Sequence, residues 1–70
     1  MTETVSFRVY VDPDANPEVI GRRFEGDGVE FTGFANRKPC PVVTFEVAEP
    51  VESFCARLEL DPDVVKYDQS

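Results

Sequence analysis

The chain has 70 residues, and its 14 acidic and 7 basic side chains give a net charge of −7 at neutral pH. Such a short chain forms one domain with a small core, and a hydrophobic fraction of 41% is too high for a disordered acidic polypeptide. The sequence contains no histidine, which excludes Ser-His-Asp and Cys-His catalysis and removes the commonest metal ligand. We therefore expect residues 1–70 to form a single non-enzymatic domain that uses no cofactor and no metal.

The chain carries no recognisable membrane or export signal. No apolar run approaches the roughly 20 residues that a membrane-spanning helix needs. Residues 1–4 have neither the basic start nor the apolar middle of a signal peptide. We expect a cytoplasmic protein without a membrane partner.

Residues 5–11 alternate between apolar and polar side chains, with Val5, Phe7, Val9 and Val11 on one face. This period of two predicts a half-buried strand. The strand ends at residues 12–17, where two prolines and several Asp and Asn residues favour turns.

Residues 17–25 allow two interpretations. Asn16 as N-cap and Pro17 at the first helical position would begin a short helix. Alternatively, a strand from Val19 to Glu25 would turn through residues 26–28 (Gly-Asp-Gly) into a second strand at 29–34, as a hairpin. The extended form is slightly favoured, because Gly21 lies mid-segment and the apolar residues form no clean helical stripe.

The second half of the chain predicts a strand, a helix and a closing strand. After a polar loop at 35–41, residues 42–47 alternate like the first strand. A helix from Pro50 to Leu60 follows, because Val51, Phe54, Cys55 and Leu58 recur at helical spacing. Residues 61–63 (Asp-Pro-Asp) end this helix, and residues 64–67 read as a short strand.

These elements predict an α+β fold, in which a small antiparallel sheet of four or five strands packs one main helix, about Pro50–Leu60, on one face. If residues 17–24 are helical, the order becomes the ferredoxin-like βαββαβ arrangement. In both arrangements the sheet offers a single apolar face, so one layer of core holds the fold. A homodimer or a bound partner would therefore stabilise it.

Two features resemble known ligand sites but favour structural roles. Asp12, Asp14 and Asn16 have the spacing of a calcium loop, but Pro17 replaces its glycine and Arg23 its closing glutamate, so a turn is the better interpretation. Cys40 and Cys55 would lie about 15 Å apart if the helix returns over its preceding strand, so no disulfide is expected.

Basic and aromatic residues are interleaved in the middle of the chain, as in surfaces that stack single-stranded nucleic acid. A net charge of −7 repels a polyanion, so we expect no direct nucleic-acid binding. The residues concerned are Arg22, Arg23, Arg37 and Lys38, with Phe24, Phe31 and Phe34.

Negative charge is concentrated in the carboxyl-terminal third. Residues 1–45 hold seven acids and five bases, whereas residues 46–70 hold seven acids and two bases. A row of carboxylates along a helix can imitate part of a nucleic-acid backbone and attract a basic surface. An ordinary solvated face, or an adaptation for solubility, explains the same pattern. The candidate partner-binding residues are Glu46, Glu49, Glu52, Glu59, Asp61 and Asp63.

Two functions are consistent with these features. The first is a small inhibitor or regulator that blocks the basic surface of a nucleic-acid-handling protein, a type common in phages and mobile elements. The second is an accessory subunit held in a larger complex by apolar contact or by strand addition at an edge such as Val5–Val11 or Val64–Tyr67.

Overall fold

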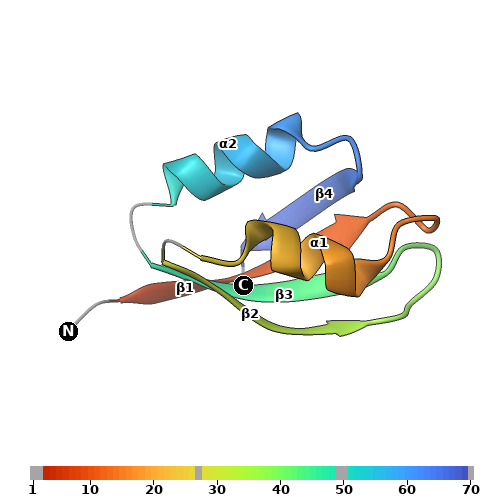
Figure 1. Ribbon diagram of the computed structural model, residues 1–70, viewed down its shortest axis with the longest axis horizontal. Coiled ribbons are helices and arrows are strands. Elements are labelled where there is room, and N and C mark those ends of the chain that lie inside the picture. Colours follow the sequence, from red (N-terminus) through yellow and green to blue (C-terminus); the bar gives the residue numbers. More distant parts are fainter. Residues whose placement is uncertain (1–2, 27, 49–50, 70) are drawn as a thin grey trace.

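The computed structural model describes residues 3–26, 28–48 and 51–69 (Figure 1). Four strands form one antiparallel sheet in the order β2-β3-β1-β4, and two helices cover one of its faces. The predicted α+β fold with a four-stranded antiparallel sheet is confirmed, with two helices in place of one main helix. The elements in chain order are β1 (Thr4–Val11), α1 (Pro17–Phe24), β2 (Val29–Ala35), β3 (Val42–Ala48), α2 (Glu52–Leu60) and β4 (Val64–Gln69).

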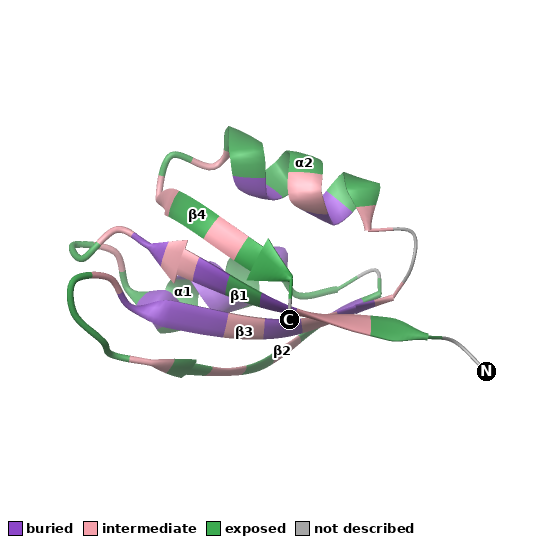
Figure 2. Ribbon diagram, turned by 180° about the vertical axis from the view of Figure 1, so that it is seen from behind, coloured by how far each residue is buried: buried purple, intermediate pink, exposed green. Residues whose placement is uncertain are grey.

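The two central strands carry the alternation that the sequence predicts. In the antiparallel pairing of β1 with β3, Phe7 lies opposite Phe45 and Val9 opposite Val43, and all four side chains are buried. Figure 2 shows these buried positions alternating with more exposed ones along both strands. One face of the sheet therefore supplies the strand half of the core.

Residues 17–24 form helix α1, so the extended interpretation was wrong. The Asn16 side chain accepts a hydrogen bond from the Glu18 backbone N–H at 3.0 Å, which caps the helix as Asn-Pro predicts. Gly21, which argued against a helix, faces the sheet: a Cβ there would lie 2.5 Å from the Phe31 ring. Close packing against β2, rather than helix propensity, thus explains the glycine.

The predicted hairpin through residues 26–28 is also replaced, by a turn that joins α1 to β2. Gly26 and Val29 exchange two backbone hydrogen bonds of 2.9 Å, and Asp27 lies outside the described residues. Gly28 has a φ of 86°, a left-handed conformation that glycine adopts without strain. The turn brings the Gly28 carbonyl to the Ala48 N–H at 2.7 Å, so β2 begins beside the end of β3.

The apolar stripe of α2 is confirmed. Phe54 and Leu58 are buried, and Val51 and Cys55 are partly buried against the same core. The described helix begins at Glu52, and the predicted start at Pro50 lies outside the described residues. Cys40 and Cys55 are both free thiols.

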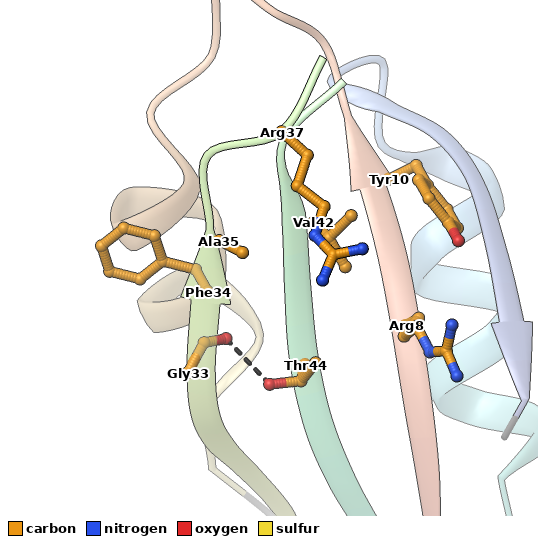
Figure 3. Close-up of a pocket in the computed structure, with 8 residues that line it drawn as sticks. All are labelled: Arg8, Tyr10, Gly33, Phe34, Ala35, Arg37, Val42 and Thr44. Carbon is orange, nitrogen blue, oxygen red and sulfur yellow. Dashed lines mark hydrogen bonds between the residues drawn. The ribbon is translucent and has the colours of Figure 1, made fainter. Parts of the chain in front are cut away.

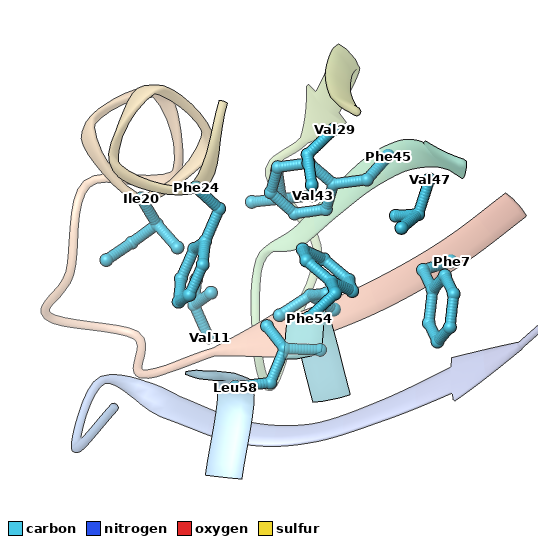
Figure 4. Packing of buried hydrophobic residues seen from close by; sticks show 11 residues of the cluster. Phe7, Val11, Ile20, Phe24, Val29, Val43, Phe45, Val47, Phe54 and Leu58 are labelled. Atoms are coloured by element: carbon cyan, nitrogen blue, oxygen red, sulfur yellow. The ribbon is translucent and has the colours of Figure 1, made fainter. Parts of the chain in front are cut away.

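Aromatic rings from both helices meet in one core (Figure 4). The Phe54 ring centroid lies 5.1 Å from that of Phe7, 5.9 Å from Phe24 and 5.3 Å from Phe45. All three contacts are edge-to-face, the arrangement that aromatic quadrupoles favour. Since α1 and α2 pack on the same side, the opposite face of the sheet is left uncovered by helices.

Candidate interaction surface

The acidic residues proposed from the sequence do not share one surface. Glu46 lies on the uncovered side of β3, where its carboxylate accepts a hydrogen bond from Ser6 Oγ at 2.7 Å. Glu52 and Glu59 lie on α2, on the other side of the sheet. Glu49 is outside the described residues.

Glu59 is an acceptor within the fold as well as an exposed carboxylate. The Tyr67 hydroxyl donates a hydrogen bond to Glu59 Oε2 at 3.1 Å, which joins α2 to β4. Partial burial, together with this hydrogen bond, raises the pKa of Tyr67 to about 12.

Asp61 and Asp63 are engaged by an internal cation. Arg23 Nη1 lies 2.8 Å from Asp61 Oδ2 and 3.1 Å from Asp63 Oδ2. These hydrogen bonds raise the pKa of Arg23 above its ordinary value. The Asp61 side chain is only 8% exposed, so it holds α1 against the turn after α2 and offers little to a partner.

The two Asp-Pro-Asp segments form matching turns side by side. In each, the side chain of the first aspartate accepts a hydrogen bond of 2.9 Å from the backbone N–H two residues later. Asp14 donates to Asp12, and Asp63 donates to Asp61. The Asp12 N–H also donates to the Asp63 carbonyl at 2.8 Å. Residues 12–16 form the turn that the sequence predicts. Among the described residues, no group of three His, Cys, Asp or Glu side chains could hold a metal ion.

The uncovered side of the sheet, here called the open face, carries the polar positions that alternate with the core. Strand register places Arg8 and Tyr10 of β1 opposite residues of both neighbouring strands, and Ser6 opposite Glu46 of β3. A bulge on β2 sets Thr32 and Gly33 beside Thr44, whose hydroxyl donates to the Gly33 carbonyl at 3.0 Å. The open face comprises Ser6, Arg8, Tyr10, Glu30, Thr32, Gly33, Ala35, Val42, Thr44, Glu46, Lys66 and Asp68.

Basic side chains divide between the two sides of the sheet. On the helix side, Arg22 pairs with Glu18 at 3.1 Å, Arg23 pairs with two aspartates, and Arg57 donates to the Arg23 carbonyl at 3.1 Å. The remaining four form no ion pair within the part of the chain that the structure describes. We call these four the basic end: Arg8, Arg37, Lys38 and Lys66.

The basic end surrounds two adjoining shallow depressions that share Tyr10, Arg37 and Val42. The larger, of about 490 Å³, is lined by both Arg8 and Arg37. Figure 3 shows the Arg37 guanidinium reaching over Val42, with Arg8 on the neighbouring strand. Lys66 Nζ lies 4.8 Å from the centroid of the Tyr10 ring, a cation–π contact that covers one face of that ring.

Two carboxylates occupy the other end of the open face. Glu30 of β2 lies directly opposite Glu46 of β3 in the strand register. Like charges in this relation destabilise a sheet. We call Glu30 and Glu46 the acidic end. The open face is thus polarised along its strands. Asp68, opposite Arg8, is the one acid among the residues of the open face that lies beside the cations.

The aromatic residues considered for nucleic-acid stacking lie on the helix side. Phe24 and Phe31 pack with Phe45 at centroid distances of 6.1 and 6.0 Å, and Phe34 stacks on Phe31 at 6.2 Å. The basic end was missed from sequence because it combines β1, β4 and the loop between β2 and β3. Only the strand order, which no local motif encodes, brings them together.

Comparison with known proteins gave no match: no family model fits the chain, and no curated protein or solved structure is significantly similar to it. Neither α1 nor α2, the helices of the described residues, is long and apolar enough to span a membrane.

Proposed function

We propose that this chain is a non-enzymatic protein-interaction domain, which binds a carboxylate-bearing surface through the basic end of its open face. The observation that carries the proposal is the gathering of cations without acidic partners on the uncovered side of an otherwise acidic protein. Each helix-side arginine makes a polar contact within the fold, whereas none of these four forms an ion pair in the described part of the chain.

The chemistry of the site favours carboxylates over a nucleic-acid strand. Guanidinium groups bind planar carboxylates through paired hydrogen bonds, and Arg8 and Arg37 line one depression beside small side chains. Binding of a nucleic-acid strand relies on stacking of its bases on exposed aromatic rings. Lys66 covers one face of Tyr10, and Phe34, the other ring that lines the larger depression, stacks on Phe31. The net charge of −7 also opposes the approach of a long polyanion.

A titration with a short oligoglutamate peptide tests this proposal. In heteronuclear NMR spectra, the peptide should shift the amide signals of Tyr10, Val42 and Thr44 together with the side-chain N–H signals of Arg8 and Arg37. The double variant Arg8→Gln/Arg37→Gln should weaken this binding at least tenfold. Arg22→Gln/Arg57→Gln, on the helix side and equally a loss of two arginine charges, is the matched control. Equal effects of both variants, or shifts confined to the helix side, would overturn the proposal.

A second candidate function uses the acidic side of α2, as an inhibitor of a basic, nucleic-acid-handling protein. It is supported by the seven-residue spacing of Glu52 and Glu59, which places two exposed carboxylates on one helix side about 10.5 Å apart along the axis. An oligolysine peptide should then shift α2 signals, and Glu52→Lys/Glu59→Lys should abolish that binding while Glu18→Lys on α1 leaves it intact. Binding that survives the α2 reversal would remove this candidate.

We also infer a ferredoxin-like arrangement for the fold. The element order β-α-β-β-α-β, the antiparallel pairing of all neighbouring strands and the central position of β1 and β3 support it.

A further inference from the structure

We infer that the partner of the open face is a second copy of this chain, packed face to face in a two-fold symmetric dimer. This inference rests on the proposed function, because it assigns the carboxylates that the basic end binds. Those carboxylates are the acidic end of the other copy, Glu30 and Glu46.

The charge pattern of the open face is complementary to itself. The acidic end and the basic end occupy opposite ends of the same strands: along β3, Glu46 lies at one end and Val42, beneath Arg37, at the other. A second copy turned end for end over the sheet would set each basic end against the other copy's acidic end. A two-fold axis makes both contacts identical, as a closed dimer requires.

The acidic end supplies an independent reason to expect an external cation. Glu30 and Glu46 are direct cross-strand neighbours, a pairing that is unfavourable without a positive group nearby. Ser6 donates one hydrogen bond to Glu46, but no cation pairs with either carboxylate among the described residues. In the two-fold arrangement, Arg37 of the second copy reaches this pair and removes the repulsion.

The centre of the open face suits a close contact between two sheets. At the level of Thr44, β2 contributes the short residues Thr32 and Gly33, and the Thr44 hydroxyl is already satisfied by the Gly33 carbonyl; Arg8 of β1, opposite Thr44, is the charged side chain at this level. The hydroxyls of Thr32 and Thr44 therefore keep intramolecular partners when a second face covers them. The helices remain on the outer sides of the dimer.

The size of the face sets the expected strength. Four strands about 4.8 Å apart, each contributing about six residues at ~3.3 Å, make a face of roughly 400 Å² per copy. Such a contact, about 800 Å² over the two copies, lies below the roughly 1,200 Å² of stable interfaces and within the range of weak, transient ones, so we expect a dimer half-formed at on the order of 100 µM. Salt near 0.15 M screens the net charges beyond about 8 Å but leaves contacting pairs attractive.

Sedimentation equilibrium of two charge-reversal variants, separately and mixed, tests this inference. Arg37→Glu reverses the basic end and Glu30→Arg the acidic end; both residues are exposed, and neither makes an ion pair within the described chain. The native chain should approach twice its mass of 7.9 kDa as its concentration rises to about 1 mM. Each variant alone should stay monomeric, and an equimolar mixture should dimerise again. Arg22→Glu, on α1, should dimerise like the native chain.

Two results would overturn the dimer: a native chain that stays monomeric at about 1 mM, or variants whose mixture does not recover association. A monomeric chain whose basic end still binds oligoglutamate would leave the proposed function standing and exclude only the second copy as partner. Loss of both responses would remove both. Circular dichroism of each variant checks that the fold is retained.

Discussion

Replacing Gly21 by alanine sets two effects of known size against each other. In an exposed helix, alanine is more favourable than glycine by about 1 kcal/mol. Here the added Cβ would lie 2.5 to 2.6 Å from three atoms along one edge of the Phe31 ring. That ring cannot retreat freely, because it stacks on Phe34 and packs against Phe45 at centroid distances of 6.2 and 6.0 Å.

Overpacking of this kind costs about 1 to 3 kcal/mol, so the net effect of Gly21→Ala is a destabilisation of up to about 2 kcal/mol. Urea unfolding followed by far-ultraviolet circular dichroism measures it, and a 1 kcal/mol loss would lower the melting temperature by about 4–8 °C. Val19→Ala, at a half-exposed position of the same helix, should instead be neutral or slightly stabilising. A Gly21→Ala variant more stable than the native chain would refute the packing explanation, and Phe31→Leu should restore the benefit of alanine if it is correct.

Three further predictions concern the core, the internal ion pairs and the tyrosine on β4. Phe54→Ala should lower the free energy of unfolding by about 3–5 kcal/mol, close to the whole stability expected of 70 residues. The NMR spectrum of this variant should therefore lose the signal dispersion of a folded protein. Cooperative unfolding near the native midpoint would contradict this. Arg23→Gln should cost about 1 kcal/mol in urea unfolding, more than Arg22→Gln, whose ion pair is more exposed; equal losses would show that the two-aspartate contact adds nothing. Burial and a hydrogen bond raise the pKa of Tyr67 from 10.0 to about 12, so its stabilising contribution is complete below pH 10 and should disappear as the pH rises to 12. Ultraviolet titration should show one tyrosine that ionises at higher pH than the other, and Tyr67→Phe should flatten the pH dependence of stability.

The strands and α2 were predictable because each buries one face of a regular pattern. The alternation from Val5 to Val11 and the stripe containing Phe54 and Leu58 are local signals, and burial follows them directly. Helix α1 was harder to predict, because Gly21 is required by its contact with the Phe31 ring, which lies on a later strand. Asn16 and Pro17 correctly indicated the start of a helix. Gly21, which is there for packing, made the segment look unfavourable for a helix.

The candidate surface was beyond sequence reasoning for a different reason. Acidic residues close in sequence separate in space: Glu46 and Glu52 lie on opposite sides of the sheet, while Asp61 pairs with an arginine 38 residues away. Cations distant in sequence converge instead, as Arg8 and Lys66 do through the pairing of β1 with β4. Net charge by chain segment therefore does not say which charges the fold places together, and it missed the cations of the basic end.

The strand order carries a consequence for how the molecule is made. Each of the three strand pairings joins a strand from residues 4–35 to one from residues 42–69, since β1 pairs with β3 and β4, and β2 pairs with β3. A growing polypeptide accordingly holds no sheet partner for its first two strands until the third has been synthesised. Cleavage in the connecting segment at 36–41 should yield two peptides that are unstructured apart and regain the fold when combined.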